Sequence, residues 1–458
     1  VDENGLVNYA EVIGGEEVDN GDFANGTTGW ITTNGSITVT NGEATILGNS
    51  ANGGVYQSLA QAGVTYFVEI EVLSINSGNW YAGGYITNIY LIDNIGKISF
   101  YYTSTGTGFH ILSSGGAGSI TIDNVSVKEV TRDNVPRIDY TGGGCPHILA
   151  EPQRTNDIQY SQDFSNAVWN NLSIGTTPVL TSGFTSPDGT DNAYKISNAN
   201  QDSFWFISGT VSATDSRTIY ARTVSGTGTA QLLSHNSNTN NTFNLTEEWQ
   251  RFEVSSTTSA TGNTSYYAVD FRGSGTLTEL LIWGAQSEVG SYATSYIPNF
   301  GTALGVTRNQ DIFTRDGIGS LINSTEGVLF VEAATFENGA DCRITLSDGT
   351  ITNRVSIEWD ILANTIKGFV GSDGNLVSPA TYNQTDYNKI AIKYKENDCA
   401  LWINGTEVDT DFAVSVLSGV NQLEFSNYGG SLTFEGKVKQ LQVYDTALTD
   451  VQLTSLTS

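Results

Sequence analysis

Apolar and polar residues alternate one by one in several short stretches of this chain, and this period-2 pattern limits the folds open to it. From Tyr66 to Val72 every second residue is apolar, while Glu69 and Glu71 lie between them. Because successive side chains of a strand point to opposite faces, such a stretch predicts a half-buried antiparallel strand. Similar alternation recurs at 98–102, 120–127 and 389–395. The pattern predicts antiparallel sheets with one buried face.

The composition favours the same fold class. The 458 residues include 50 glycines, the alternating stretches are separated by runs of Asn, Ser and Thr, and long helical patterns are missing. Many short strands with tight turns are typical of β sandwiches, and this length predicts about three domains of roughly 150 residues. One short helical turn is expected near residue 450, because Thr449 and Gln452 have capping-box spacing.

The charge excludes some partners. The chain carries 20 basic and 48 acidic residues, a net charge of −28. A field of that sign repels phosphate backbones and anionic lipids, so we expect no nucleic-acid partner and no membrane insertion. No apolar run approaches the roughly 20 residues that a membrane span needs. The chain lacks methionine and begins Val1-Asp2-Glu3, and we expect that its start was removed by processing or lies outside this sequence.

Residues 132–156 are a strap rich in proline and glycine. They hold three of the seven prolines, a run of three glycines and Cys145. Proline and glycine at this density predict a connector without a strand ladder or a helix, and the fixed φ of proline keeps it stiff. Its apolar residues are expected to dock on a neighbouring domain: Ile138, Tyr140, Ile148 and Leu149.

The predicted organisation has six parts. They are an N-terminal arm (1–18), a first module (19–131), the strap (132–156), a second module (157–298), a linker (299–316) and a third module (317–458).

Motifs of the first module resemble family 4/9-type carbohydrate-binding modules, which are β jelly rolls. They are NGDF with GW at 20–30, GVTYFVEIEV at 63–72 and IDNVSVKEV at 122–130. The second module echoes the first and last of these motifs at 162–169 and 280–289, which predicts a duplicated sandwich. In this family calcium is commonly held between the first and last strands, and the resemblance implies calcium ligands at Asn20, Asp22, Asp123 and Asn124. Turn formation explains the same residue types without a metal.

Aromatic residues are the candidates for sugar binding, because such modules stack ring faces on pyranoses and add polar hydrogen bonds. Trp80, Tyr81 and Tyr85 lie in a Gly-rich stretch that predicts an exposed loop. Trp205, within the sequence SFWF, is the next candidate. Packing in the core is the alternative at each position. Five other tryptophans lie in strand-like motifs and are predicted to be core: Trp30, Trp169, Trp249, Trp283 and Trp402.

The third module resembles the laminin-G/concanavalin A-like lectin family, through ALWINGTEV at 400–408 and FEGKVKQLQVYDTALTDVQL at 434–453. The expected fold class is therefore all-β, with two jelly-roll modules followed by a concanavalin A-like jelly roll. Laminarinase-type glycosidases of this fold carry Glu-x-Asp-x-x-Glu on one strand. Here Glu358 and Asp360 match, but Ala363 replaces the second glutamate. A retaining mechanism without its proton donor is not expected to run.

No other catalytic pattern stands out. The histidines are scattered, no Cys/His spacing suggests zinc, and no glycine-rich loop has a nucleotide-binding context. Cys342 and Cys399 lie in the same module, and their pairing stays open.

The region 132–311 is similar to stretches of phage tail-fibre and other virion proteins, through PRIDYTGGGCPHILAEPQRTN at 136–156, YSQDFSNAVW at 160–169 and GSYATSYIPNFGTALGVTRNQD at 290–311. The resemblance implies a non-enzymatic virion structural or adhesion protein, a fibre or decoration component at the virion surface or outside the cell. Its expected partners are a host-surface polysaccharide or glycan, other virion proteins and further copies of itself, with a trimer expected from fibre proteins in general. A purely structural virion spacer, a secreted bacterial adhesin and a non-catalytic arm of a polysaccharide-degrading enzyme are the alternatives.

Overall fold

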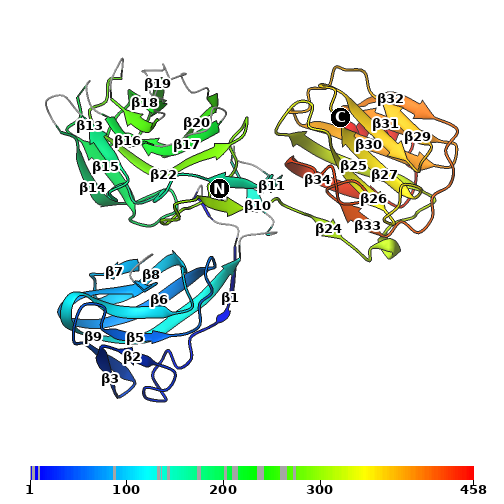
Figure 1. Cartoon of the computed structure of the whole chain (residues 1–458). Helices are drawn as coiled ribbons and strands as arrows, with labels where there is room; N and C mark the ends of the chain where they lie inside the picture. Colours follow the sequence, from blue (N-terminus) through cyan, green and yellow to red (C-terminus); the bar gives the residue numbers. More distant parts are fainter. Residues whose placement is uncertain are drawn as a thin grey trace. The chain divides into compact units, whose positions relative to one another are not determined.

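A computed structural model describes residues 2, 6–8, 11–85, 89–131, 135, 137–141, 145–172, 177–200, 204–208, 215–234, 242–257, 266–271 and 275–458. Its sheets are antiparallel β sandwiches (Figure 1), which confirms the predicted fold class. The chain divides into two compact units, one holding Asp133–Arg154 with Arg308–Ser458 and the other holding Glu11–Arg132 with Thr155–Thr307.

The N-terminal sandwich is a sheet of nine strands that folds over its own core. They are β1 (Val12–Glu16), β2 (Ile31–Thr33), β3 (Gly35–Thr40), β4 (Glu43–Gly48), β5 (Gly54–Gln57), β6 (Thr65–Gly83), β7 (Ile89–Ile92), β8 (Gly96–Thr103) and β9 (Phe109–Thr131). The long strands β6 and β9 pair along most of their length and carry four register shifts. Tyr66, Val68, Ile70 and Val72 are all buried, as their alternation predicts.

The second sandwich has two five-stranded sheets, β13-β16-β21-β18-β19 and β14-β15-β22-β17-β20. Its strands are β13 (Asn170–Leu172), β14 (Val179–Phe184), β15 (Ala193–Ser197), β16 (Phe204–Ser208), β17 (Asp215–Arg222), β18 (Gly228–Ser234), β19 (Thr242–Leu245), β20 (Gln250–Thr257), β21 (Tyr266–Asp270) and β22 (Leu280–Val289). Two short strands, β12 (Arg154–Asn156) and β23 (Val306–Arg308), pair with each other.

The C-terminal sandwich packs a seven-stranded sheet, β10-β11-β34-β25-β30-β31-β32, on a six-stranded sheet, β24-β33-β26-β27-β28-β29. Its elements are β10 (Arg137–Asp139), β11 (His147–Ala150), β24 (Thr314–Arg315), the 3₁₀ helix η1 (Gly319–Leu321), β25 (Glu326–Thr335), β26 (Cys342–Ser347), β27 (Arg354–Trp359), β28 (Ile366–Val370), β29 (Gly374–Val377), β30 (Asn388–Lys395), β31 (Cys399–Ile403), β32 (Thr406–Asp411), β33 (Gln422–Glu424), β34 (Gly436–Tyr444) and α1 (Asp450–Thr457).

Helix α1 confirms the predicted capping box. The side chain of Gln452 accepts a hydrogen bond from the backbone N–H of Thr449 at 2.9 Å. Leu453 is buried against β25, β30 and β31 residues, so the helix covers the outer face of the seven-stranded sheet. No helix in the described ranges is long and apolar enough to cross a bilayer.

The prediction that the strap forms no ladder is wrong. Strands β10 and β11 pair with each other, and β11 pairs with β34, with Ile148 opposite Val438. Pro146 and Pro152 lie outside β11, so they remove no ladder hydrogen bond from it. The hairpin can therefore pair with a strand that comes much later in the chain, a partner that local composition does not reveal. Ala150 is buried in the core of the C-terminal sandwich.

Four buried charged side chains fasten this hairpin to the segment 308–311, and we call them the strap cluster. Arg137 pairs with Glu151 at 3.0 Å and with Asp311, and Arg308 pairs with Glu151 at 3.2 Å. Each of the four side chains is at most 10% exposed. The Glu151 backbone N–H donates to Asp311 Oδ2 at 2.7 Å, and the Asp311 N–H donates to the Glu151 carbonyl at 2.9 Å.

Candidate functional site

Trp80 and Tyr81 do not lie in an exposed loop, and that prediction is wrong. Both belong to β6 and are 1% and 2% exposed. Trp80 pairs with Ile92 in the core of the N-terminal sandwich, and its Nε1 donates to the Ser77 carbonyl at 3.1 Å. Trp205 lies in β16 and is 7% exposed, within the core of the second sandwich. Because these rings are buried, they cannot stack on a sugar. At these positions the alternative role, packing in the interior, is the one that the structure shows.

Tyr85 is exposed, at 49%, and stands in a row of three rings that we call the aromatic row. The His110 ring stacks on Tyr56, with centroids 5.1 Å apart and planes at 21°. The Tyr85 ring lies 5.3 Å from His110 on a tilted plane. The row spans three neighbouring segments, because His110 on β9 is opposite both Tyr56 on β5 and Gly83 on β6.

The alternation of the strands turns the row away from the core. Val55 and Ile111 are fully buried in the core, so their neighbours Tyr56 and His110 face outward. Near Tyr85, the Tyr81 hydroxyl donates to Asn52 Oδ1 at 2.9 Å. Burial, and then the nearby Tyr85 phenol, raise the pKa of Tyr81 to about 12. Phenol rings and a stacked imidazole offer the apolar ring faces and polar edges that saccharides bind.

Burial also lowers the pKa of His110 below its ordinary value of 6.5. The His110 imidazole therefore binds a proton more readily in the unfolded chain than in the folded one. As a result, the free energy of unfolding decreases as the pH falls through 6.5. We expect the urea stability of the N-terminal sandwich to fall more steeply between about pH 7 and pH 5 in the wild type than in His110→Gln. Equal slopes for the two proteins would show that His110 does not carry this dependence.

The four predicted calcium ligands come together at two adjoining turns. The Val125 N–H donates to the Gly21 carbonyl at 2.9 Å, which places the turn at Asn20 and Asp22 beside that at Asp123 and Asn124. Asn20 and Asn124 have φ values of 56° and 49°, which suit turn residues.

The same side chains make local hydrogen bonds. The Asn20 amide donates to the Gly26 carbonyl at 2.9 Å, Asp22 accepts from the Ala24 N–H, and Asn124 donates to Glu71 at 2.8 Å. In the described ranges, no three His, Cys, Asp or Glu residues are grouped to hold a metal. The calcium site stays a prediction.

The outer face of the six-stranded sheet is the second polar surface, and we call it the arginine face. On it Arg343, Glu358 and Lys367 are opposite one another on β26, β27 and β28. Arg343 pairs with Glu358, and Lys367 lies 3.7 Å from Glu358 and also pairs with Asp360. Both carboxylates of the glycosidase-like motif are thus buried and held by cations. A free nucleophile and a protonated acid are what that chemistry requires.

Aromatic rings alternate with guanidinium groups on the arginine face. Arg343 and Arg354 lie 4.9 and 4.8 Å from the centroid of the Phe369 ring. Arg354 also lies 5.2 Å from that of Tyr428. Below them, the hydroxyls of Thr345 and Ser356 are 2.9 Å apart and fully buried.

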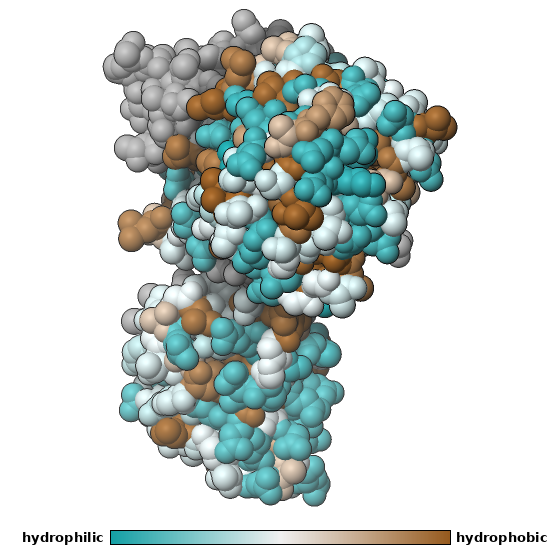
Figure 2. Space-filling model, turned by 90° about the vertical axis from the view of Figure 1, so that its right-hand side faces the viewer, coloured by the Kyte–Doolittle hydropathy of each residue, from teal (hydrophilic) through white to brown (hydrophobic). Residues whose placement is uncertain are grey.

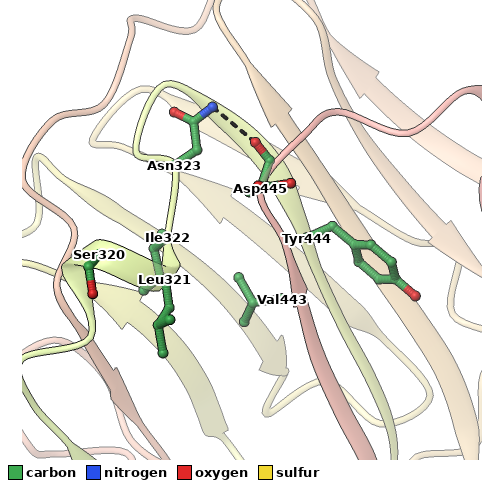
Figure 3. A pocket seen from close by; sticks show the side chains of 7 residues that line it. All are labelled: Ser320, Leu321, Ile322, Asn323, Val443, Tyr444 and Asp445. Atoms are coloured by element: carbon green, nitrogen blue, oxygen red, sulfur yellow. Dashed lines mark hydrogen bonds between the residues drawn. The ribbon is translucent and has the colours of Figure 1, made fainter.

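A shallow pocket of about 480 Å³ lies between η1 and the end of β34 (Figure 3). Asn323 donates to the Asp445 carbonyl across it at 2.9 Å, while the Tyr444 ring points away. We find no convergent catalytic groups at this pocket.

On the face shown in Figure 2, hydrophobic residues are scattered among hydrophilic ones. Cys342 and Cys399 are buried free thiols, and Cys145 is an exposed free thiol.

Sequence reasoning named Tyr85 and missed Tyr56 and His110. Both missed residues lie in short alternating stretches, GVYQ and FHIL, where the apolar neighbours face the core. That alternation was the available signal, but only the sheet shows that the two rings are opposite each other.

No family model matches the chain, and comparison with curated proteins finds no match either. Among solved structures, the chain is similar to a leech intramolecular trans-sialidase, at 19% identity and a TM-score of 0.26, over 30% of this chain and 24% of that one. It is also similar to the CBM40 of a Ruminococcus gnavus IT-sialidase bound to sialyllactose, at 15% identity and a TM-score of 0.26, over 32% and 98%. Mouse laminin α1 domains LG4-5 match at 13% identity and a TM-score of 0.21, over 61% and 96%. Because these TM-scores are low, we infer no function from the matches.

Proposed function

We propose that this protein is a non-enzymatic glycan-binding protein whose N-terminal sandwich holds saccharides on the aromatic row. The observation that carries the proposal is the outward row of Tyr56 stacked on His110, with the 49% exposed Tyr85 tilted beside them. Ring faces that are fixed by a sheet provide a preorganised platform for the apolar face of a sugar. The pairing of Glu358 and Asp360 with cations supports a role without catalysis.

The setting that we propose is a phage virion appendage, a fibre or decoration component that presents the sandwiches to a glycan of the host surface. The sequence likeness at 132–311 supports this setting, and so does the clamped strap, which resists extension better than a loose linker does. Other virion proteins and further copies of this chain, with a trimer as the expected oligomer, are the proposed structural partners. The protein then works outside the cell, on the virion surface.

Glycan binding is tested by titrating the full chain with host-envelope polysaccharide and with a glycan array. We expect Tyr85→Ala and Tyr56→Ala each to weaken binding about five- to tenfold, the loss of roughly one aromatic contact. Phe412→Ala is the matched control, because Phe412 is 67% exposed and lies on the C-terminal sandwich. An absence of binding to any glycan or host envelope would instead support a purely structural spacer.

The same titrations in the presence of a calcium chelator test the proposed site at Asn20, Asp22, Asp123 and Asn124. We expect chelation to lower the melting temperature of the N-terminal sandwich, because a bound ion stabilises the folded state by mass action. Unchanged melting and binding would leave these residues as turn formers.

A further inference from the structure

Arg354 on the arginine face is a buried cation that packs on aromatic rings. It is 6% exposed and lies between the rings of Phe369 and Tyr428. Its Nε donates to the Gly371 carbonyl at 3.2 Å. In the part of the chain that the structure describes, it forms no ion pair, while Arg343 and Lys367 on the same face both do.

This arrangement is costly without an anionic partner. Buried charges are normally paired, because removing a charge from water costs several kcal/mol or more. Burial and then the like charge of Arg343 lower the pKa of Arg354. The charge of Glu358 opposes this lowering, but Glu358 is already held by Arg343 and Lys367. The terminal nitrogens of a guanidinium are suited to a planar carboxylate or a sulfate.

The surroundings of Arg354 can accept a saccharide as well as a charge. Phe369 and Tyr428 are half-buried and expose part of their rings. Tyr428 stands on a tight turn, where Asn427 Oδ1 accepts hydrogen bonds from the N–H groups of Gly429 at 2.9 Å and Ser431 at 3.0 Å. The chain's net charge of −28 acts against anions in general, but at physiological salt charges more than about 8 Å away are largely screened.

We propose that Arg354 binds the anionic group of an acidic saccharide, a uronate carboxylate or a sulfate ester, with Phe369 and Tyr428 flanking the sugar ring. The proposal rests on the glycan-binding function and adds a second site, specific for charged sugars, on the C-terminal sandwich.

The test is isothermal titration of the full chain with a galacturonic acid trisaccharide, its methyl ester and a sulfated galactose trisaccharide. We expect the acid or the sulfated sugar to bind at least about tenfold more tightly than the neutral ester. Arg354→Gln should abolish that preference, while Arg354→Lys should keep part of it. Tyr85→Ala should leave it unchanged, because the aromatic row is a separate surface. Hydrogen exchange of β27 and β28 peptides checks that each variant is folded.

Any of the following outcomes would overturn the proposal. The acid and the ester could bind equally, a folded Arg354→Gln could retain the preference, or neither anionic sugar could bind at millimolar concentration. A preference that disappears in Tyr85→Ala but not in Arg354→Gln would also overturn it, while upholding the proposed function of the aromatic row. Stronger binding of the carboxylate or of the sulfate identifies which group the site takes.

Discussion

Asp311→Ala is expected to lower the free energy of local opening of the β10–β11 hairpin by about 3–5 kcal/mol. Asp311 is 1% exposed at its side chain and pairs with Arg137. Its Oδ2 also accepts the Glu151 N–H at 2.7 Å. Removal of this carboxylate leaves a buried cluster with one excess positive charge and an orphaned backbone donor. Hydrogen exchange measured on peptides that cover β11 and β34 reports the opening free energy directly.

Two further variants separate charge from packing in the strap cluster. Asp316→Ala removes an exposed carboxylate from the same region and is expected to change stability by less than about 0.5 kcal/mol. The double variant Arg137→Met/Asp311→Leu replaces one buried pair with apolar groups, and we expect it to recover part of the loss, because the Glu151 N–H still lacks its acceptor. Asp311→Ala exchange rates equal to those of Asp316→Ala would mean that the cluster does not hold the hairpin.

Asn156→Ala is expected to destabilise the second sandwich by about 3–5 kcal/mol, because several buried backbone groups lose their partner at once. Asn156 is fully buried, and its amide donates to the carbonyls of Ala285 at 3.1 Å and Ile297 at 2.7 Å. Its Oδ1 accepts from the N–H groups of Ile158 at 3.0 Å and Ser287 at 3.2 Å. One side chain thus joins the start of the sandwich to β22 and to the segment after it.

Pulse proteolysis in urea, with identification of the fragments, measures this loss inside the full chain. Asn156→Asp keeps the size but loses both donors, so it should be destabilised at least as much as the alanine variant. Asn170→Ala is the control, because Asn170 is exposed, and we expect its urea midpoint to stay at the wild-type value. An Asn156→Ala midpoint that matches the control would show that these hydrogen bonds are replaced after substitution.

The site was harder to predict than the strands that carry it. Alternation over 64–72 correctly predicted which face of β6 is buried, although the pairing of β6 with β9 carries register shifts between Glu69 and Asn79. A shift of one residue exchanges the two faces of a strand. Trp80 nevertheless lies in the same core as Tyr66. Its burial was missed because a glycine-rich stretch that looked like a loop is the buried end of a strand.

The all-β class, the alternating strands and the capping box of α1 could be predicted from local residue patterns, because these depend on side chains within a few residues of one another. The folded chain was needed to show that β11 joins β34, that the strap cluster forms, and that Tyr56, His110 and Tyr85 make one row. Each of these needs two or more segments that are distant in the chain. Strand pairing and burial set such contacts, and neither leaves a local pattern in the sequence.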